Sequence, residues 1–278
     1  MELLFSPLFS GSGGNAVYVG CEESGILIDA GVSCARVVNE LEKIGVSPTS
    51  LKALLITHEH SDHIAGAGIL SRKFDLPIYA TEGTWRGMEE KVGQIQPKNM
   101  RLVDPRIDFF VDGMNIMPFP IPHDAMEPCG YSISLGGIKA SVATDLGCIR
   151  DGWMNAVEGS DILLLESNYD PDMLKAGKYP YSLKTRILGR KGHLSNDDAG
   201  AACVKLVGKN VKNIILGHLS KENNFPELAM ETASLALREA GVEIGRDMTL
   251  SIARRDGFSG LYSLKDGFQE LSKGVRGV

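Results

Sequence analysis

The segment Thr57-His58-Glu59-His60-Ser61-Asp62-His63 puts three histidines and an aspartate within six positions. A short apolar run at 53–57 precedes it and predicts a buried strand that leads directly into the motif. The apolar pattern at 64–74 predicts a helix that begins where the motif ends. We therefore expect a strand, a polar loop and a helix, with the polar groups held at the mouth of the strand.

The spacing of these four residues suits metal binding. His58 and His60 lie two positions apart in extended backbone, so they project the same way and can bind one ion. Asp62 and His63 fall at the expected start of the helix and can turn towards a second ion nearby. We also count Asp62 among the catalytic candidates. The alternative, an exposed polar turn, would require this pattern to arise by chance.

The other candidate ligands also follow apolar runs. His123 ends the run 117–122, His218 ends 213–217, and Asp145 ends 141–144. Polar groups at the mouths of buried strands are where a rigid scaffold can bring distant segments together. Taken singly, each histidine is more typical of a satisfied core or surface position. Beside the motif at 57–63, we predict that they are metal ligands.

The rest of the chain alternates short apolar runs with turns and amphipathic stretches, and nothing in it suggests a linker or repeat. We treat residues 1–278 as one domain and expect an α+β fold of two sheets with helices outside them. Besides 53–57, we expect strands at 16–20, 25–29, 76–80, 107–111, 115–121, 131–135, 138–143, 162–166, 211–217 and 248–253. Besides 64–74, we expect helices near 33–44, 195–207, which Ser195 and Asp198 would cap, and 226–240.

Composition narrows the class of protein. With 43% apolar and 23% charged residues, the chain can bury a sizeable core. No apolar run is long enough to span a membrane and no basic leader opens the chain, so we expect a cytoplasmic protein without a membrane partner. The five cysteines are widely spaced and are expected to be reduced thiols. A net charge of −6 argues against a protein that coats nucleic acid with its whole surface.

The pattern His58-x-His60-x-Asp62-His63, followed by His123, Asp145 and His218, resembles the metallo-β-lactamase superfamily. The resemblance implies a four-layer αββα sandwich. It implies that His58, His60 and His123 hold one ion, that Asp62, His63 and His218 hold the other, and that Asp145 bridges both. Asp29 matches an early aspartate that orients the histidine loop, although a turn-forming aspartate before Gly31 is an equal alternative.

A bridging carboxylate favours two ions and phosphoester chemistry, because two cations can neutralise charge on a phosphoryl group. Histidine and carboxylate ligands accept two Zn or Mn ions, and also Fe. Lactamases of the superfamily use a cysteine ligand for which this chain has no clear candidate. Cys148, shortly after Asp145, is the weak alternative.

Further segments resemble the WalJ/YycJ-like group, nucleases related to RNase Z. These segments are 10–16, 122–125, 143–147, 192–196 and 217–224. The resemblance covers residues 3 to about 240 and implies nuclease action on DNA, exonucleolytic from the 5′ end. No prediction of oligomeric state follows.

His193 is the histidine left after the ligands are assigned, and we expect it to be catalytic, protonating the departing oxygen or contacting the phosphate. A capping or solvent-facing histidine is the alternative. Arg190 and Lys191, with Lys184 and Arg186, predict a positive wall for a polyanionic substrate, unless they are a solvated helix face. The glycine-rich turn at 11–15 suggests that Ser12 and Asn15 also bind substrate, although a plain hairpin explains its glycines nearly as well.

The resulting hypothesis is a dinuclear metal-dependent hydrolase, a phosphodiesterase and nuclease, in which a metal-bridging hydroxide attacks a phosphodiester in line. The nearest alternative is an enzyme of the same fold that acts on a cyclic or nucleotide phosphodiester or on a thioester. A more distant alternative is a metal- or DNA-binding module without catalysis.

Overall fold

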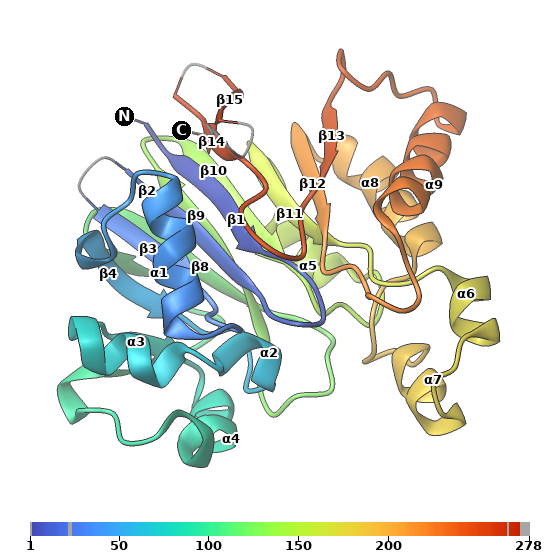
Figure 1. Cartoon of the computed structure of the whole chain (residues 1–278). Coiled ribbons are helices and arrows are strands. Elements are labelled where there is room, and N and C mark those ends of the chain that lie inside the picture. Colours follow the sequence, from blue (N-terminus) through green and yellow to red (C-terminus); the bar gives the residue numbers. More distant parts are fainter. Residues whose placement is uncertain (1, 22–23, 266, 273–278) are drawn as a thin grey trace.

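The computed structural model describes residues 2–21, 24–265 and 267–272. Two β-sheets lie face to face, and helices cover the outer face of each, so that the layers run helix, sheet, sheet, helix (Figure 1). The predicted α+β class and the αββα sandwich are therefore confirmed.

Within the described ranges, the first sheet has eight strands in the order β15-β14-β1-β2-β3-β4-β5-β6. Strands β3 to β6 run parallel, so the segments that follow β3 and β4 leave the sheet at one edge. The strands are β1 (Leu4–Phe9), β2 (Ala16–Cys21), β3 (Ser24–Ile28), β4 (Leu51–Leu55), β5 (Ile78–Ala80), β6 (Met100–Leu102), β14 (Leu261–Ser263) and β15 (Gln269–Ser272).

The second sheet, as far as the structure describes the chain, has seven strands in the order β13-β12-β11-β10-β9-β8-β7. Strands β10 to β13 are parallel, which again gathers their carboxyl ends at one edge. The strands are β7 (Phe109–Val111), β8 (Met114–Pro120), β9 (Cys129–Leu135), β10 (Ile138–Ala143), β11 (Ile162–Glu166), β12 (Asn213–Gly217) and β13 (Thr249–Ile252).

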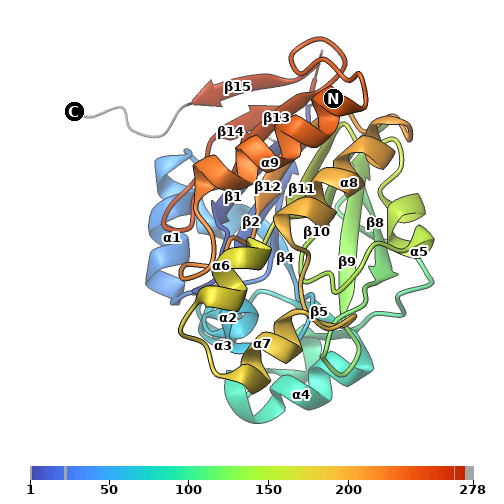
Figure 2. The same ribbon diagram turned by 90° about the vertical axis from the view of Figure 1, so that its right-hand side faces the viewer.

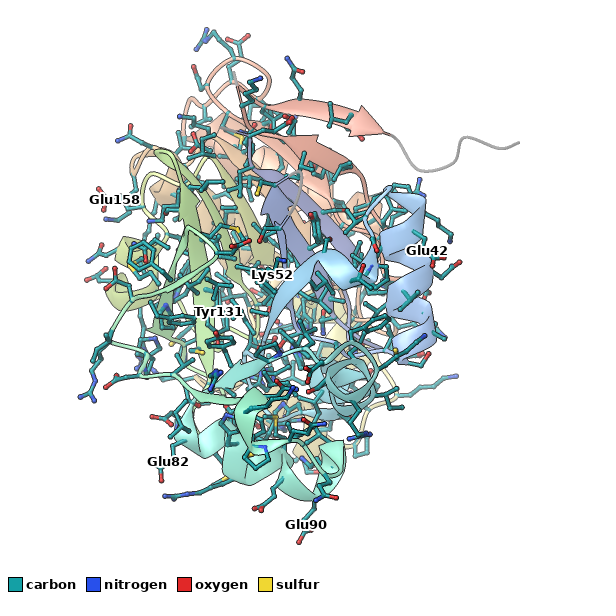
Figure 3. All side chains as sticks on the ribbon, turned by 90° about the vertical axis from the view of Figure 1, so that its left-hand side faces the viewer. Glu42, Lys52, Glu82, Glu90, Tyr131 and Glu158 are labelled. Carbon is teal, nitrogen blue, oxygen red and sulfur yellow. The ribbon has the colours of Figure 1, made fainter. Side chains whose placement is uncertain are left out.

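Both faces of the central strands are buried. In β3, Ile26 and Ile28 pack between the two sheets, whereas Leu27 packs under the helices outside. This alternation follows from the two-residue period of a strand. Tyr131, labelled inside the sandwich in Figure 3, donates a hydrogen bond of 2.9 Å from β9 to the carbonyl of Ile56, which follows β4. That bond ties the two sheets together close to the segment 57–63.

Of the α-helices in the described residues, four lie on the side of the first sheet and five on the side of the second (Figure 2). The first group is α1 (Cys34–Lys43), α2 (Ser61–Ile64), α3 (Ala67–Phe74) and α4 (Glu82–Val92), with short 3₁₀ turns at Pro48–Ser50 and Pro97–Asn99. The second group is α5 (Asp151–Ala156), α6 (Pro171–Ala176), α7 (Tyr181–Ile187), α8 (Asn196–Val207) and α9 (Pro226–Glu239).

The predicted capping of α8 is confirmed, because the Ser195 hydroxyl accepts a hydrogen bond from the Asp198 amide. The prediction of one continuous helix at 64–74 is wrong. The chain forms two helices, α2 and α3, which meet at Gly66. A Cβ at Gly66 would lie 2.3 Å from the carbonyl oxygen of Val32, so this junction needs glycine.

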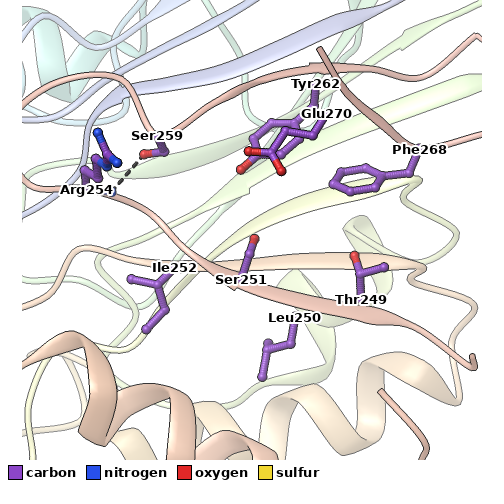
Figure 4. A pocket seen from close by; sticks show the side chains of 9 residues that line it. All are labelled: Thr249, Leu250, Ser251, Ile252, Arg254, Ser259, Tyr262, Phe268 and Glu270. Carbon is purple, nitrogen blue, oxygen red and sulfur yellow. Dashed lines mark hydrogen bonds between the residues drawn. The ribbon is translucent and has the colours of Figure 1, made fainter. Parts of the chain in front are cut away.

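Among the described residues, no helix is long and apolar enough to cross a bilayer. A cavity of about 440 Å³ opens where β13 faces β14 and β15, and Arg254, Tyr262 and Phe268 are among the residues that line it (Figure 4). No candidate site residue from the sequence belongs to that lining.

Candidate metal centre

The candidate ligands meet at the shared edge where the parallel strands of both sheets end. Asp29 follows β3, the segment 57–63 follows β4, and Asp145 and His218 follow β10 and β12. Asp29, Asp145 and His218 have φ values of 60°, 59° and 56°, which is the left-handed region that non-glycine residues rarely adopt. These residues turn the chain sharply at the ends of the strands, and the surrounding structure must hold them there.

Three histidines form the first group. Nδ1 of His60 lies 3.1 Å from Nε2 of His58 and 3.3 Å from Nε2 of His123. With bonds of 2.0–2.1 Å to a tetrahedral ion, two ligand nitrogens would stand about 3.4 Å apart. The three nitrogens therefore converge at the spacing of ligands to one ion.

A second group contains Asp62, His63 and His218. Oδ2 of Asp62 lies 3.6 Å from Nε2 of His63 and 3.7 Å from Nε2 of His218. Asp145 lies between the two groups: its carboxylate is 3.4 Å from His63, 3.5 Å from His218 and 3.7 Å from His123. All seven residues predicted as ligands are thus brought into one cluster.

The cluster also leaves polar atoms that a cation would satisfy. Oδ2 of Asp145 and Nε2 of His218 are buried and have no hydrogen-bond partner among the described residues. Such atoms are costly to bury unless something binds them. Imidazole nitrogens and carboxylate oxygens are ligands for divalent transition metals, so the residues fit divalent metal ions.

The electrostatics favour the protonation state that a ligand needs at His58, Asp145 and Asp62. At His63 and His218, burial lowers the pKa, but Asp145 and other nearby carboxylates more than offset this and raise it, to about 9 for His63, so that metal binding there must displace a proton. Burial, together with the neighbouring His63, holds the pKa of His58 well below its usual value, so the ring is neutral. Burial raises the pKa of Asp145, but His218 and His63 more than offset this and hold it well below the usual range. Burial likewise opposes ionisation of Asp62, yet the nearby His63 and His218 lower its pKa to about 2.

Asp29 supports the histidine segment. Its carboxylate accepts hydrogen bonds from the Thr57 amide at 2.8 Å, from the Thr57 hydroxyl at 2.8 Å and from Nδ1 of His63 at 2.7 Å. This arrangement fixes the ring so that Nε2 faces the cluster. The geometry is that of a residue that orients the loop, as the resemblance implied.

Glu166, at the end of β11, is a member of the site that the sequence reasoning missed. Its buried carboxylate accepts hydrogen bonds from Nδ1 of His193 at 2.7 Å and Nδ1 of His218 at 2.9 Å. The amides of Leu146 and Leu194 donate to its other oxygen at 2.6 and 3.1 Å. Burial raises its pKa, but His193 and His218 lower it below its usual value. One feature of the sequence could have indicated this role: Glu166 ends an apolar run, and Asp145 and His218 likewise follow apolar runs.

His193 borders the cluster from a different segment. Its side chain is 16% exposed, and Nδ1 lies 3.7 Å from Asp145. Arg190 and Lys191 lie just before it and are exposed, while the carbonyl of Gly192 contacts Nδ1 of His123 at 3.1 Å. His193 therefore has one edge open to solvent at the rim of the site.

The two residues of the glycine-rich turn lie in different environments. Ser12 is exposed, but Asn15 is buried, and its amide nitrogen lies 3.2 Å from Nε2 of His63 and 3.3 Å from the carbonyl of Asp62. Asn15 therefore contacts the ligands themselves and is not at an open surface. Cys148 contacts the Arg190 carbonyl at 3.5 Å, and no metal-binding group formed by the described residues includes it.

Comparisons with known proteins agree with this geometry. A family model described as a Beta-lactamase superfamily domain matches residues 25–218. Exodeoxyribonuclease YycJ of Bacillus anthracis is 39% identical over 246 residues, which cover 88% of this chain and 93% of the relative. Exodeoxyribonuclease WalJ of Streptococcus pneumoniae is 38% identical over 245 residues, covering 87% and 91%.

Among solved structures, the metallo-beta-lactamase fold protein YhfI from Bacillus subtilis is similar. It superimposes with a TM-score of 0.71 at 16% identity and covers 95% of this chain and 100% of its own. At this identity the likeness concerns the fold alone, and it agrees with the two sheets and flanking helices described above.

Proposed function

Since this chain belongs to the beta-lactamase superfamily, we propose that it is a dinuclear metal-dependent nuclease that degrades DNA from its 5′ end. The predicted resemblance to the WalJ/YycJ-like group is confirmed by the two exodeoxyribonucleases, which match most of the chain. Metal-dependent hydrolysis follows from the family and from the cluster of histidines and carboxylates. The number of ions, the DNA substrate and the 5′ polarity are our proposals.

The observation that carries the proposal is the position of the Asp145 carboxylate. It lies 3.7 Å from His123 in the first group and 3.4 Å from His63 in the second. One carboxylate shared by two sets of ligands supports a two-ion site, with His58, His60 and His123 around one ion and Asp62, His63 and His218 around the other. Two divalent ions supply an activated water and neutralise the charge that develops on a phosphoryl group.

Within this scheme His193 donates a proton to the oxygen that leaves the phosphate. Its Nδ1 is held by Glu166 at 2.7 Å, so Nε2 is the nitrogen free to meet substrate. A buried carboxylate bound to Nδ1 fixes the tautomer and orientation of the ring. Glu166 thus acts through His193 and His218 as a positioning residue.

Substrate contacts come from the rim. Arg190 and Lys191 precede His193 and are exposed, which suits them to bind phosphates on either side of the scissile one. Ser12 is also exposed and remains a candidate for phosphate contact. Asn15 contacts Asp62 and His63, and we assign it to positioning of the ligands in place of substrate binding.

The test is hydrolysis by the metal-loaded protein. We expect metal-dependent release of nucleotides from linear DNA with a free 5′ end and little release from 5′-blocked DNA. EDTA should abolish the release of nucleotides from either substrate. Asp145→Ala should abolish turnover. Asp112→Ala is the matched control, because Asp112 is also an aspartate with positive φ but lies exposed in the turn between β7 and β8.

The outcomes separate the parts of the proposal. Full activity of Asp145→Ala would remove the bridging role. Hydrolysis of bis-p-nitrophenyl phosphate without any action on DNA would favour a small-diester enzyme. Equal rates on free and 5′-blocked ends would overturn the polarity.

A further inference from the structure

Residues 170–192 form an arm that stands out from the sandwich and contains α6 and α7 (Figures 1 and 2). The arm has a small core of its own, in which Leu174 and Ile187 pack with Tyr169, Tyr179 and Leu183. This cluster is separate from the three larger cores.

The arm is cationic in an acidic protein. Residues 170–192 contain six lysine or arginine side chains and two aspartates, whereas the other parts of the chain contain 23 cations and 33 acids. Some of these charges are already paired: Lys175 lies 3.3 Å from Asp172, and the Lys184 ammonium binds the carbonyl of Lys175. Arg190 and Lys191 remain exposed. A positive surface of this kind attracts a polyanion.

Helix α7 and Leu188, the residue after it, present a row of exposed side chains on the outer face. Leu183 and Ile187 face the core of the arm, while Tyr181, Thr185 and Leu188 recur at helical spacing and are exposed. The Tyr181 side chain is 85% exposed, more than any other large apolar residue of the described chain, and Leu188 is 48% exposed. At this exposure the ring buries little surface in the fold.

The C-terminal end of α7 lies directly against the metal centre. The carbonyl of Ile187 accepts a hydrogen bond of 3.1 Å from the amide of His193, so the turn at 188–192 folds back onto the helix. Arg186 forms an ion pair with Asp124, the residue after His123, and its Nη2 lies 2.9 Å from Oδ1. Tyr181 is six residues before Ile187, which places it roughly 9 Å further along the helix axis.

We propose that the outer face of α7 is a platform for a single-stranded segment of the DNA substrate, on which Tyr181 stacks against an unpaired base. Arg190 and Lys191, in the turn between the platform and His193, hold the phosphates that lie nearest to the scissile bond. Stacking on an aromatic ring requires a base that is not already stacked in a duplex, so the platform selects single strands. This inference rests on the proposed nuclease function.

The test compares KM and kcat on single-stranded and double-stranded DNA for the full metal-loaded protein. Base stacking contributes about 1–3 kcal/mol per base, so Tyr181→Ala should raise KM for single-stranded DNA by roughly 5- to 150-fold. We expect kcat, and hydrolysis of bis-p-nitrophenyl phosphate, to stay within twofold of wild type. Tyr181→Trp should retain the low KM, and Tyr181→Leu, which is apolar but not aromatic, should not.

The matched control is Phe110→Ala, because Phe110 is an aromatic residue that is 69% exposed on β7, in the second sheet. It should leave KM unchanged. If wild type degrades no DNA, the proposed function itself fails. If wild type degrades DNA and Tyr181→Ala keeps the wild-type KM, the platform alone is refuted. An equal rise in KM for duplex and single strands would also overturn it, as would a change of oligomeric state in Tyr181→Ala.

Discussion

Replacing Glu166 by glutamine perturbs the metal centre without replacing any of the seven proposed ligands. The Glu166 carboxylate accepts four hydrogen bonds, from the amides of Leu146 and Leu194 and from Nδ1 of His193 and His218. Backbone amides can only donate, so the glutamine oxygen must face them. Its NH₂ group then faces both imidazole rings, whose Nδ1 atoms now donate to Glu166.

The two outcomes open to His218 both weaken metal binding. If the ring keeps its proton on Nδ1, it loses a charge-assisted hydrogen bond that contributes about 1.5–3 kcal/mol. If the proton moves to Nε2, the nitrogen 3.5 Å from Asp145 can no longer donate a lone pair to an ion. Loss of such a supporting contact typically costs 10- to 100-fold in metal affinity, or about 1.4–2.8 kcal/mol.

The assay is titration of metal-free protein with Zn²⁺ or Mn²⁺ against a chelator of known affinity. Glu40→Gln is the control, because Glu40 is also a buried carboxylate bound by a cation, Lys43, and a backbone amide, that of Phe258. Both variants should lower the free energy of unfolding, but only Glu166→Gln should weaken metal binding. If Glu166→Gln binds both equivalents of metal within twofold of wild type, the positioning role is refuted.

Other consequences can be tested separately. Asp145→Ala should lower kcat on every phosphodiester by more than a thousandfold while far-UV circular dichroism stays unchanged; measurable turnover near wild type would contradict this. Asp29→Asn should reduce metal affinity about 10- to 100-fold in a chelator titration, because it weakens the support of Thr57 and His63. Ser195→Ala should lower the free energy of unfolding in urea by about 1 kcal/mol through loss of the α8 cap, with kcat retained. Metal at 100 times its Kd should stabilise the protein by about 2.7 kcal/mol per site in calorimetry, and EDTA should reverse this.

The strands that carry the site could be predicted because their residues are apolar on both faces. β4 and β12 are buried along most or all of their length, and proposed metal ligands follow each of them. The apolar run in the sequence therefore indicates both the strand and the position of the ligands. β1 was missed because Pro7 lies inside it and argues against a strand. The structure accommodates Pro7 with a register shift against β2 between Pro7 and Phe9, which no local pattern indicates.

Helix α4 was missed for a different reason. Gly83 and Gly87 lower helix propensity, so the segment does not look helical in isolation. Their role is tertiary: a Cβ at Gly83 would lie 2.5 Å from Glu127, and one at Gly87 would lie 2.3 Å from Glu59. Both contacts bring α4 against the loops that carry His60 and His123, and only the folded chain reveals them.

The candidate ligands could be predicted because histidine is rare in this chain, and five of its six copies fall in the motif or shortly after a strand. Glu166 could not be distinguished in the same way. Glutamate is common on surfaces, and one that ends an apolar strand resembles an ordinary solvated terminus. Burial and the two imidazole partners, which identify its role, come from segments 27 and 52 residues away in the sequence.

The left-handed backbone at Asp29, Asp145 and His218 affects which substitutions a directed-evolution experiment would select. Glycine would adopt these dihedral angles without steric cost, whereas a side chain there costs roughly 1 kcal/mol. A library selected only for melting temperature would therefore enrich glycine at the three positions where the side chain is needed most. Heat tolerance and turnover are in conflict at these residues, so screening for thermostable variants must select for activity in every round.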